Sequence, residues 1–207
     1  MQIHTFFRGG YASNSYFLVT DSEACIIDPS IGYDDVLRYL GGNMPNVKYI
    51  ILTHAHFDHI LGNYATAQKY QIPLASHPDG DEYFKNAHAY ASSFGMNYDK
   101  NKTLFPSIEL YEHQIIKIGD DELEVIHTPG HAKGCCCFYC EEQDFIITGD
   151  TLFFRGIGRT DLPGGSYSQI VESIKYKLYE LPDETVCYCG HGPETTIGDE
   201  KHFGSII

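Results

Sequence analysis

Three histidines and one aspartate fall within six positions of the chain, between His54 and His59. The apolar, β-branched run from Tyr49 to Leu52 precedes this cluster and predicts a short buried strand. The residues from Ile60 onward are typical of the start of a helix. The cluster is therefore expected at a strand-to-helix turn, at the carboxyl end of a strand, where sheet proteins tend to place their binding sites.

The side chains of this cluster indicate a metal site. Neutral imidazole and carboxylate groups are ligands that zinc and other first-row metals prefer. Alternation in an extended turn places His54, His56 and Asp58 on one side, and His59 leaves from the first helical turn. Four donors from so short a stretch cannot all reach one small ion, which favours two adjacent metals. The alternative is a His-rich surface loop or a tag-like tract.

Three further candidate ligands follow downstream, each beside a glycine in a turn. His131 ends the run His-Thr-Pro-Gly-His, Asp150 directly follows an apolar strand, and His191 follows another strand. Glycine lets the backbone approach another group closely at such points. Remote partners at matching strand ends favour a built metal site over a surface loop.

With these residues in view, the chain resembles the metallo-β-lactamase superfamily over nearly its whole length. The order His-x-His-x-Asp-His, His, Asp, His carries the resemblance. It implies an α+β fold in which two mixed β-sheets pack face to face with helices outside, as a four-layer αββα sandwich. Residues 1–207 would form one such domain, without a separate C-terminal glutathione-binding helical domain.

The resemblance also implies two divalent metal ions per chain, with zinc favoured over iron or manganese. It assigns seven ligands: His54, His56 and His131 to one ion, Asp58, His59 and His191 to the other, and Asp150 between them. A hydroxide that bridges the ions would be the nucleophile. Asp58 is the expected catalytic residue, because it would orient that nucleophile or take its proton. β-Lactamase activity is not expected from a second-metal set that includes His59 and Asp150.

The stretch from Gly149 to Gly165 is similar to the matching region of the glyoxalase II-like branch, which hydrolyses hydroxyacyl thioesters of glutathione. The resemblance suggests Arg159 as a substrate-binding residue, with Lys133 and Arg155 as further positive residues near the site. An ion pair of Arg159 with Asp161 that shapes the loop is an equally weighted alternative.

Two departures separate the chain from full glyoxalase II. The chain ends soon after Gly192-Pro193, which leaves no room for the additional C-terminal domain of that enzyme. Ala132 and Cys135 replace hydroxyl residues in the motif around His131. The chain therefore resembles the short, single-domain glyoxalase II-like hydrolases most closely.

Two other functions stay open. Persulfide dioxygenases share the Gly-Arg-Thr-Asp stretch that begins at Gly158, and would hold one iron on two histidines and one carboxylate: His54, His131 and Asp150. A non-enzymatic module that responds to thiols or metals could use the four cysteines between Cys135 and Cys140. The favoured interpretation of these cysteines is a buried strand that uses Cys as a small apolar residue.

Composition limits the partners. A formal net charge of −14 argues against nucleic acid or anionic membrane as the main partner, but not against a small anionic substrate such as a glutathione or other thiol conjugate. The N-terminus lacks the pattern of a secretory signal, and no apolar run is long enough to span a membrane. Seven cysteines are then expected to be reduced thiols in the cytoplasm. The oligomeric state is not predicted.

Periodicity and turn residues also predict the secondary structure. Strands are expected at residues 2–7, 15–20, 24–28, 47–53, 72–76, 114–118, 122–127, 135–139, 144–148 and 185–189. Helices are expected at residues 33–40, 59–70, 79–93 and 167–181. His88 and His113 have no companion at ligand spacing and are expected to be structural or surface residues.

Overall fold

A computed structural model describes residues 1–6, 13–30 and 46–204 of the chain. These residues form two compact units, each built on one six-stranded sheet. The N-terminal unit contains Met1–Glu109 and Ile118–Asp120, and the C-terminal unit contains Leu110–Lys117 and Asp121–Ile207. Both sheets are mixed, so the expected α+β class with two mixed sheets and helices is confirmed.

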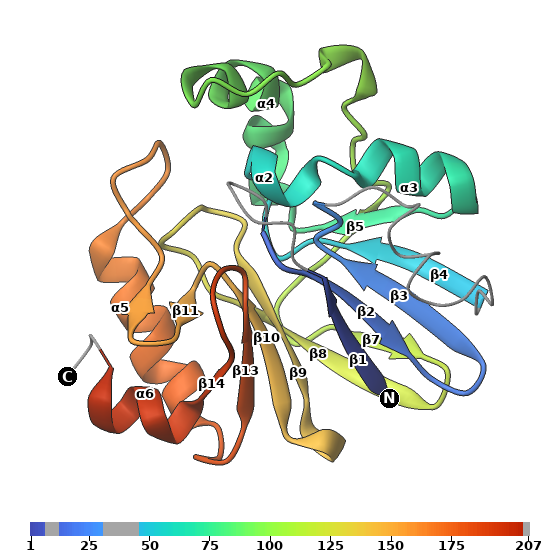
Figure 1. Ribbon diagram of the computed structural model, residues 1–207. Helices are drawn as coiled ribbons and strands as arrows, with labels where there is room; N and C mark the ends of the chain where they lie inside the picture. The colour runs from blue at the N-terminus through green and yellow to red at the C-terminus, as the bar shows by residue number, and fades with distance from the viewer. Residues whose placement is uncertain (7–12, 31–45, 205–207) are drawn as a thin grey trace. The chain divides into compact units, whose positions relative to one another are not determined.

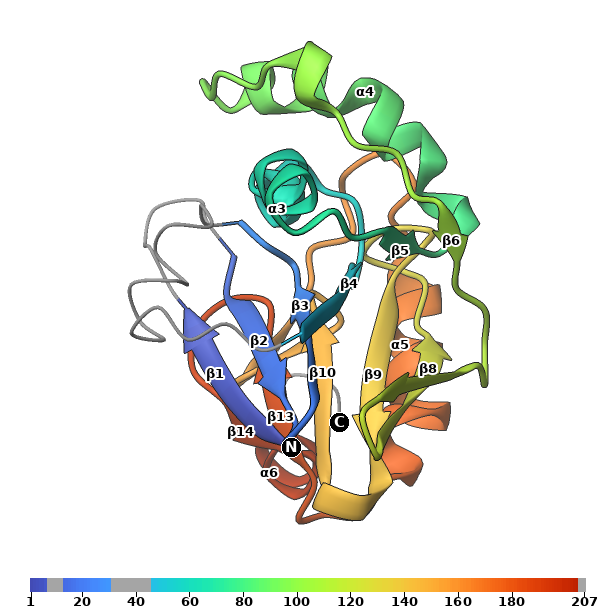
Figure 2. The ribbon, with the colours of Figure 1, turned by 90° about the vertical axis from the view of Figure 1, so that its right-hand side faces the viewer.

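The sheet of the N-terminal unit has the strand order β1-β2-β3-β4-β5-β6. Its strands are β1 (Gln2–Phe6), β2 (Ser15–Val19), β3 (Glu23–Ile27), β4 (Asn46–Ile51), β5 (Leu74–Ser76) and β6 (Ile108–Glu109). The first three strands are antiparallel, and β3 to β6 run parallel (Figures 1 and 2). Ile27 pairs with Ile51, so β3 and β4 end side by side. Whatever follows these two strands therefore meets at one edge of the sheet.

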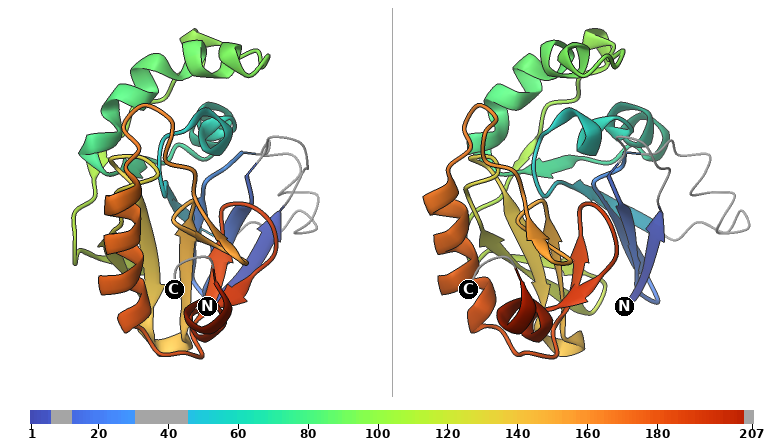
Figure 3. Two further views of the ribbon diagram at one scale, coloured as in Figure 1. Left: turned by 90° about the vertical axis from the view of Figure 1, so that its left-hand side faces the viewer. Right: turned by 60° about the vertical axis from the view of Figure 1, so that its left-hand side comes forward.

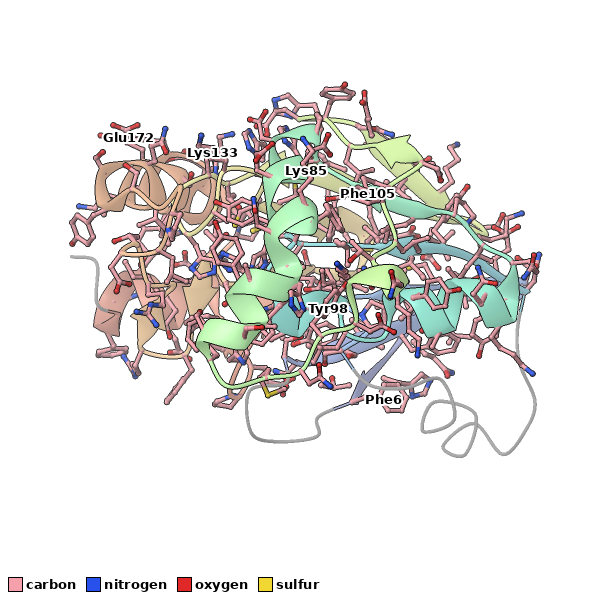
Figure 4. All side chains as sticks on the ribbon, turned by 90° about the horizontal axis from the view of Figure 1, so that it is seen from above. Phe6, Lys85, Tyr98, Phe105, Lys133 and Glu172 are labelled. Carbon is pink, nitrogen blue, oxygen red and sulfur yellow. The ribbon has the colours of Figure 1, made fainter. Side chains whose placement is uncertain are left out.

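The helices of this unit are α2 (Phe57–Ile60), α3 (Asn63–Tyr70) and α4 (Asp81–Ser93), with 3₁₀ turns η1 (Pro78–Gly80) and η2 (Lys100–Lys102). The single helix expected over residues 59–70 is wrong, because it is interrupted at Leu61 and Gly62. The Gly62 N–H donates to the carbonyl of Pro29 at 2.6 Å, a bond outside the helix. In Figure 4, Tyr98 and Phe105 lie on the loop that follows α4.

The sheet of the C-terminal unit has the order β14-β13-β10-β9-β8-β7. Its strands are β7 (Ile115–Ile118), β8 (Asp121–His127), β9 (Cys136–Cys140), β10 (Phe145–Gly149), β13 (Val186–Cys189) and β14 (Thr195–Thr196). Strands β10 and β13 are parallel, and Gly149 pairs with Cys189 across a register shift. The residues that follow these two strands, Asp150 and His191 among them, consequently leave the sheet at the same edge.

Helix α5 (Tyr167–Tyr176) packs along this sheet and is drawn in orange in Figure 3. Ser166 caps it by accepting a hydrogen bond from the Gln169 N–H. Ile170, Ile174 and Leu178 recur at intervals of four and are fully buried in one core cluster. The helix ends at Tyr176 rather than at residue 181, and a 3₁₀ turn, η4 (Leu178–Glu180), follows.

The remaining elements of the C-terminal unit are short. They are the 3₁₀ turn η3 (Glu141–Gln143), the hairpin of β11 (Leu152–Phe153) with β12 (Gly156–Ile157), and α6 (Ile197–Phe203). The hairpin, α6, β6 and β14 have no counterpart among the expected elements. The helix expected at 33–40 lies outside the described residues. No helix in residues 1–6, 13–30 and 46–204 has both the length and the apolar character needed to cross a membrane.

Candidate metal centre

The N-terminal unit gathers its four candidate ligands just beyond the end of β4. His54 Nε2 lies 3.1 Å from His56 Nδ1. The Nδ1 of His54 is 3.2 Å from the hydroxyl of Thr53, which itself donates to Asp28, so that hydroxyl accepts from the His54 N–H. The proton is thereby placed on His54 Nδ1, and the nitrogen that faces His56 carries a lone pair. Such a nitrogen suits a metal ion.

The second pair of donors in this unit is Asp58 and His59. Their facing atoms, Asp58 Oδ2 and His59 Nε2, are 3.7 Å apart. The Nδ1–H of His59 donates to the carboxylate of Asp28 at 2.8 Å. The lone pair of this ring is therefore on Nε2, the nitrogen that faces Asp58. His59 is fully buried, and the Asp58 side chain keeps 16% of its surface exposed.

Asp28 is a candidate functional residue that the sequence analysis missed. Its buried carboxylate accepts from the backbone N–H of Thr53 at 2.8 Å and from the Thr53 hydroxyl at 2.5 Å, besides the bond from His59. A carboxylate that orients histidine rings in this way is typical of protein metal sites. Its one sequence signal is its place at the end of β3, which becomes informative once β3 is known to lie beside β4.

Helix α4 packs against this ligand loop. The rings of His56 and Tyr83 meet edge to face with centroids 5.0 Å apart, and the rings of Phe57 and Phe94 lie 5.4 Å apart. Tyr83 and Phe84 of this helix are both buried. The helix therefore holds the ligand loop from one side.

The C-terminal unit brings together the other three candidate ligands. Asp150 Oδ2 is 3.5 Å from His131 Nε2 and 3.6 Å from His191 Nε2. Two ligands that each lie about 2.1 Å from a tetrahedral zinc ion are about 3.4 Å apart, so both distances suit ligands that share an ion. One oxygen of Asp150 thus lies within ligand spacing of both histidines.

Backbone groups surround two of these side chains, those of His131 and Asp150. The Nδ1–H of His131 donates to the carbonyl of Arg159 at 2.8 Å, which leaves a lone pair on Nε2, the nitrogen that faces Asp150. A Cβ on Gly190 would lie 2.1 Å from Asp150 Oδ1, and one on Gly158 would lie 1.9 Å from the Asp150 carbonyl. Only glycine fits at these two positions, as expected for turns in which the backbone closely approaches a ligand.

The three basic residues expected to bind substrate have different surroundings within the C-terminal unit. Lys133 is exposed on the loop after His131 (Figure 4). The backbone N–H of Arg155 donates to the carboxylate of Glu200 at 3.1 Å, and its guanidinium lies 4.8 Å from the Phe203 ring centroid. Arg159 forms a bidentate ion pair with Asp161. Their roles in substrate binding stay predictions.

The cysteines and the two isolated histidines have structural surroundings. All seven cysteines are buried free thiols, and burial raises the pKa of Cys137 to about 11 and that of Cys189 to about 12. This agrees with the interpretation of Cys as a small apolar residue in β9 and β13.

His88 and His113 both have partners other than candidate metal ligands. His88 donates to the carbonyl of Tyr98 at 2.7 Å, and His113 forms a hydrogen bond with Glu124, which raises the pKa of His113.

Comparison with known proteins reveals relatives along nearly the whole chain. A family model for the metallo-beta-lactamase superfamily matches residues 8–191. The probable metallo-hydrolase YqgX of Bacillus subtilis is 37% identical over 194 residues, 93% of this chain and 91% of that protein. The hydroxyacylglutathione hydrolase GloC of Haemophilus influenzae is 33% identical over 201 residues, 92% of this chain and 91% of that protein.

Solved structures agree with this. The B3 metallo-beta-lactamase BLEG-1 has a TM-score of 0.89 and 33% identity, and the match covers 99% of this chain and 98% of that one. The protein TTHA1623, solved in a di-iron-bound form, has a TM-score of 0.88 and 31% identity, with 99% and 100% covered.

Proposed function

The chain belongs to the metallo-β-lactamase superfamily, and from this premise we propose that it hydrolyses a thioester, such as a hydroxyacylglutathione, at a site that holds two divalent ions. Membership in a family of metallo-hydrolases supports metal-dependent hydrolysis in general. The thioester substrate and the number of ions are our proposals.

One observation carries the proposal of two ions. The donors of the N-terminal unit face one another as His54 with His56 and Asp58 with His59, and the rings of His54 and His59 lie 4.1 Å apart, so the two pairs are adjacent. The oxygen of Asp150 lies within ligand spacing of two histidines, as a bridging ligand requires. We therefore assign seven ligands in the superfamily's order: His54, His56 and His131 to one ion, Asp58, His59 and His191 to the other, and Asp150 to both. Zinc is the proposed metal.

When bound, such ions would polarise the carbonyl group under attack and lower the pKa of water to about 7. The chain's own residues then position and transfer protons. Asp58 accepts a proton from the attacking water at its partly exposed carboxylate. Hydroxide adds to the thioester carbonyl, the carbon–sulfur bond breaks, and the departing thiolate takes up the proton that Asp58 had accepted, which restores the Asp58 carboxylate and releases the thiol and the carboxylic acid. Asp28 keeps His59 in one tautomer throughout.

The proposed substrate is a small thiol conjugate, and nucleic acid and membranes are not proposed as partners. The relative GloC, named for hydroxyacylglutathione hydrolysis, supports this substrate class. Arg159, Lys133 and Arg155 would supply positive charge to an anionic substrate in a chain of net charge −14. Seven thiols without a disulfide support a reducing compartment such as the cytoplasm.

The second candidate is a persulfide dioxygenase with one iron on two histidines and one carboxylate. The relative TTHA1623 supports iron as a metal that a similar fold accepts, but it was solved with two iron ions and not with one. The candidate would use His54, His131 and Asp150, and it would leave the pair of Asp58 and His59 without a metal.

Hydrolysis of S-lactoylglutathione by zinc-loaded protein tests the proposal. We expect turnover in the wild type, a loss of at least about 100-fold in kcat in Asp58→Ala, and full activity in the control Asp120→Ala at an exposed turn. Oxygen uptake with glutathione persulfide, without thioester turnover, would favour the dioxygenase.

Because BLEG-1 is named a β-lactamase, hydrolysis of a chromogenic cephalosporin should be measured on the same protein. Hydrolysis of that compound alone would contradict the proposal.

A further inference from the structure

Glu200 is a fully buried carboxylate on α6 of the C-terminal unit (Figure 1), and the mechanism proposed above makes no use of it. Both of its oxygens lie 3.1 Å from the backbone nitrogen of Arg155. Its Oε1 also accepts from the hydroxyl of Thr195 at 2.7 Å. A buried carboxylate costs stability unless hydrogen bonds satisfy it, so these bonds indicate that the group is kept for what it holds in place.

Glu200 is itself held in a fixed position. Its backbone carbonyl accepts from the hydroxyl of Tyr179 at 2.9 Å and from the N–H of Gly204 at 3.0 Å. A Cβ on Gly204 would lie 2.8 Å from Glu200 Oε2, so the chain passes close to the carboxylate where only glycine fits. The carboxylate is therefore a fixed point to which other segments can be attached.

The first segment attached to it is the hairpin of β11 and β12. Arg155 lies in the two-residue turn of this hairpin with φ 58°, in the left-handed region that residues with a side chain rarely adopt. The bonds from its N–H to Glu200 hold the turn in this form. Phe153 ends β11, and its ring meets the ring of His191 edge to face, with centroids 6.1 Å apart and planes at 74°. The hairpin thus connects Glu200 to a proposed metal ligand.

The second attached segment is the end of the loop that carries His191. This loop runs from β13 to β14, and Thr195 is the first residue of β14. One carboxylate therefore holds both the hairpin that contacts His191 and the end of the loop that bears it. His191 is also the most exposed of the three candidate ligands of this unit, at 34% of its side chain against 4% for His131 and 10% for Asp150.

We propose that Glu200 is a positioning residue for His191. Its carboxylate joins the hairpin to β14 and so keeps the His191 ring in place for the second metal ion. Glu200 acts through Phe153 and Thr195 and is not itself catalytic. The inference rests on the proposed function for the assignment of His191 to the second ion. It predicts that loss of the Glu200 carboxylate weakens the binding of one ion and not of the other.

Competition between zinc-loaded, full-length protein and a chromogenic zinc chelator tests this proposal, because it measures the affinity of each ion without any substrate. Glu200→Gln places an NH₂ group against donors that need an acceptor. Loss of a direct partner of a ligand lowers metal affinity about 10- to 100-fold. Since Glu200 acts through a further contact, we expect the second zinc ion to bind about 3- to 10-fold more weakly. The affinity of the first ion should stay unchanged, and an unchanged second affinity would overturn the proposal.

Two further variants test whether Glu200 acts through the hairpin. Phe153→Leu removes the ring that contacts His191, and it should also weaken the second ion. The double variant with Glu200→Gln should then be no weaker than the more severe single variant, because both changes interrupt one chain of contacts. Additive losses would overturn this route. Thr195→Val removes one bond to Glu200 and keeps the side-chain shape, so it should weaken the second ion even if Glu200→Gln does not fold.

Two controls separate positioning from charge and from stability. Glu172 lies exposed on α5 of the same unit (Figure 4), and Glu172→Gln should leave both affinities unchanged. Ile174 is fully buried in the core of this unit, so Ile174→Val should lower the melting temperature of the metal-free protein without changing either affinity. Equal weakening of the second ion in Ile174→Val would show that Glu200 has only a structural role.

Failure of this inference can be distinguished from failure of the proposed function. If the wild type holds two ions and hydrolyses S-lactoylglutathione while Glu200→Gln keeps both affinities, only the role of Glu200 is wrong. If two ions bind and the second is weakened in Glu200→Gln, but no thioester is hydrolysed, only the proposed reaction is wrong. A wild type that binds a single ion would overturn both.

Discussion

The Nδ1–H of His59 donates to a carboxylate oxygen of Asp28 at 2.8 Å, and both side chains are almost completely buried. The same carboxylate accepts from Thr53, whose hydroxyl accepts in turn from His54. One buried aspartate therefore sets the tautomers of two histidines at once, one directly and one through a hydroxyl. This network joins the ends of β3 and β4 and holds the His54–His59 loop through hydrogen bonds between the chain's own side chains.

Asp28→Asn should weaken metal binding without abolishing the fold. An amide offers one accepting oxygen and an NH₂ group that cannot accept from Thr53, so one buried donor loses its partner at a cost of about 1–3 kcal/mol. Loss of such an orienting carboxylate typically lowers metal affinity about 10- to 100-fold. Competition with a zinc chelator measures this, with the exposed Asp21→Asn as control. Wild-type affinity in Asp28→Asn would show that the network does not position the ligands.

Gly190→Ala should disrupt the centre through Asp150. The added methyl group would lie 2.1 Å from Asp150 Oδ1 and 2.9 Å from the carbonyl carbon of Gly149, so the carboxylate must move. We expect loss of most bound zinc, measured by elemental analysis, with little change in circular dichroism. Gly156→Ala is the matched control, since its methyl group would meet nothing within 4 Å. Full zinc content in both variants would contradict the geometry around Asp150.

The native thiols should be unreactive. Burial raises the pKa of Cys137 to about 11 and that of Cys189 to about 12, and only the thiolate form is nucleophilic. A chromogenic disulfide reagent at pH 7.5 should label less than one thiol per native chain, and all seven after unfolding in guanidinium. Rapid labelling of several native thiols, with release of metal, would instead support a thiol-responsive module.

The pair of Arg159 and Asp161 should be visible in the pH dependence of stability. The pKa of Asp161 falls from 3.8 to about 2 in the folded chain, so its stabilising contribution is complete above pH 4 and is lost as the pH falls towards 2. Arg159→Gln should return the midpoint of the Asp161 carboxyl signal, followed by NMR, to near 3.8. The unfolding free energy of that variant should then fall less steeply below pH 4. An unchanged midpoint would exclude this ion pair in solution.

The candidate ligands could be selected from the sequence because each follows a strand that is recognisable by itself. The run from Tyr49 to Leu52 predicts a strand, and the cluster after it is dense enough to indicate metal. Asp150 and His191 follow β10 and β13, and both apolar runs are clear in the sequence. Local pattern was sufficient for these residues.

What the sequence did not reveal depends on contacts between distant segments. The role of Asp28 follows from the parallel pairing of β3 with β4, which no local pattern specifies. The break before α3 reflects a hydrogen bond from Gly62 to Pro29, and the contact of Tyr83 with His56 depends on how α4 packs. The hairpin of β11 and β12 has strands of two residues, too short for a period of two to appear.

The number and identity of bound metals test the central claim most directly. Protein purified without added metal or chelator should contain close to two ions per chain, mainly zinc, by elemental analysis. Asp150→Ala, which removes the proposed bridging ligand, should lose both. Close to one iron per chain with little zinc would contradict the dinuclear hydrolase and favour the dioxygenase.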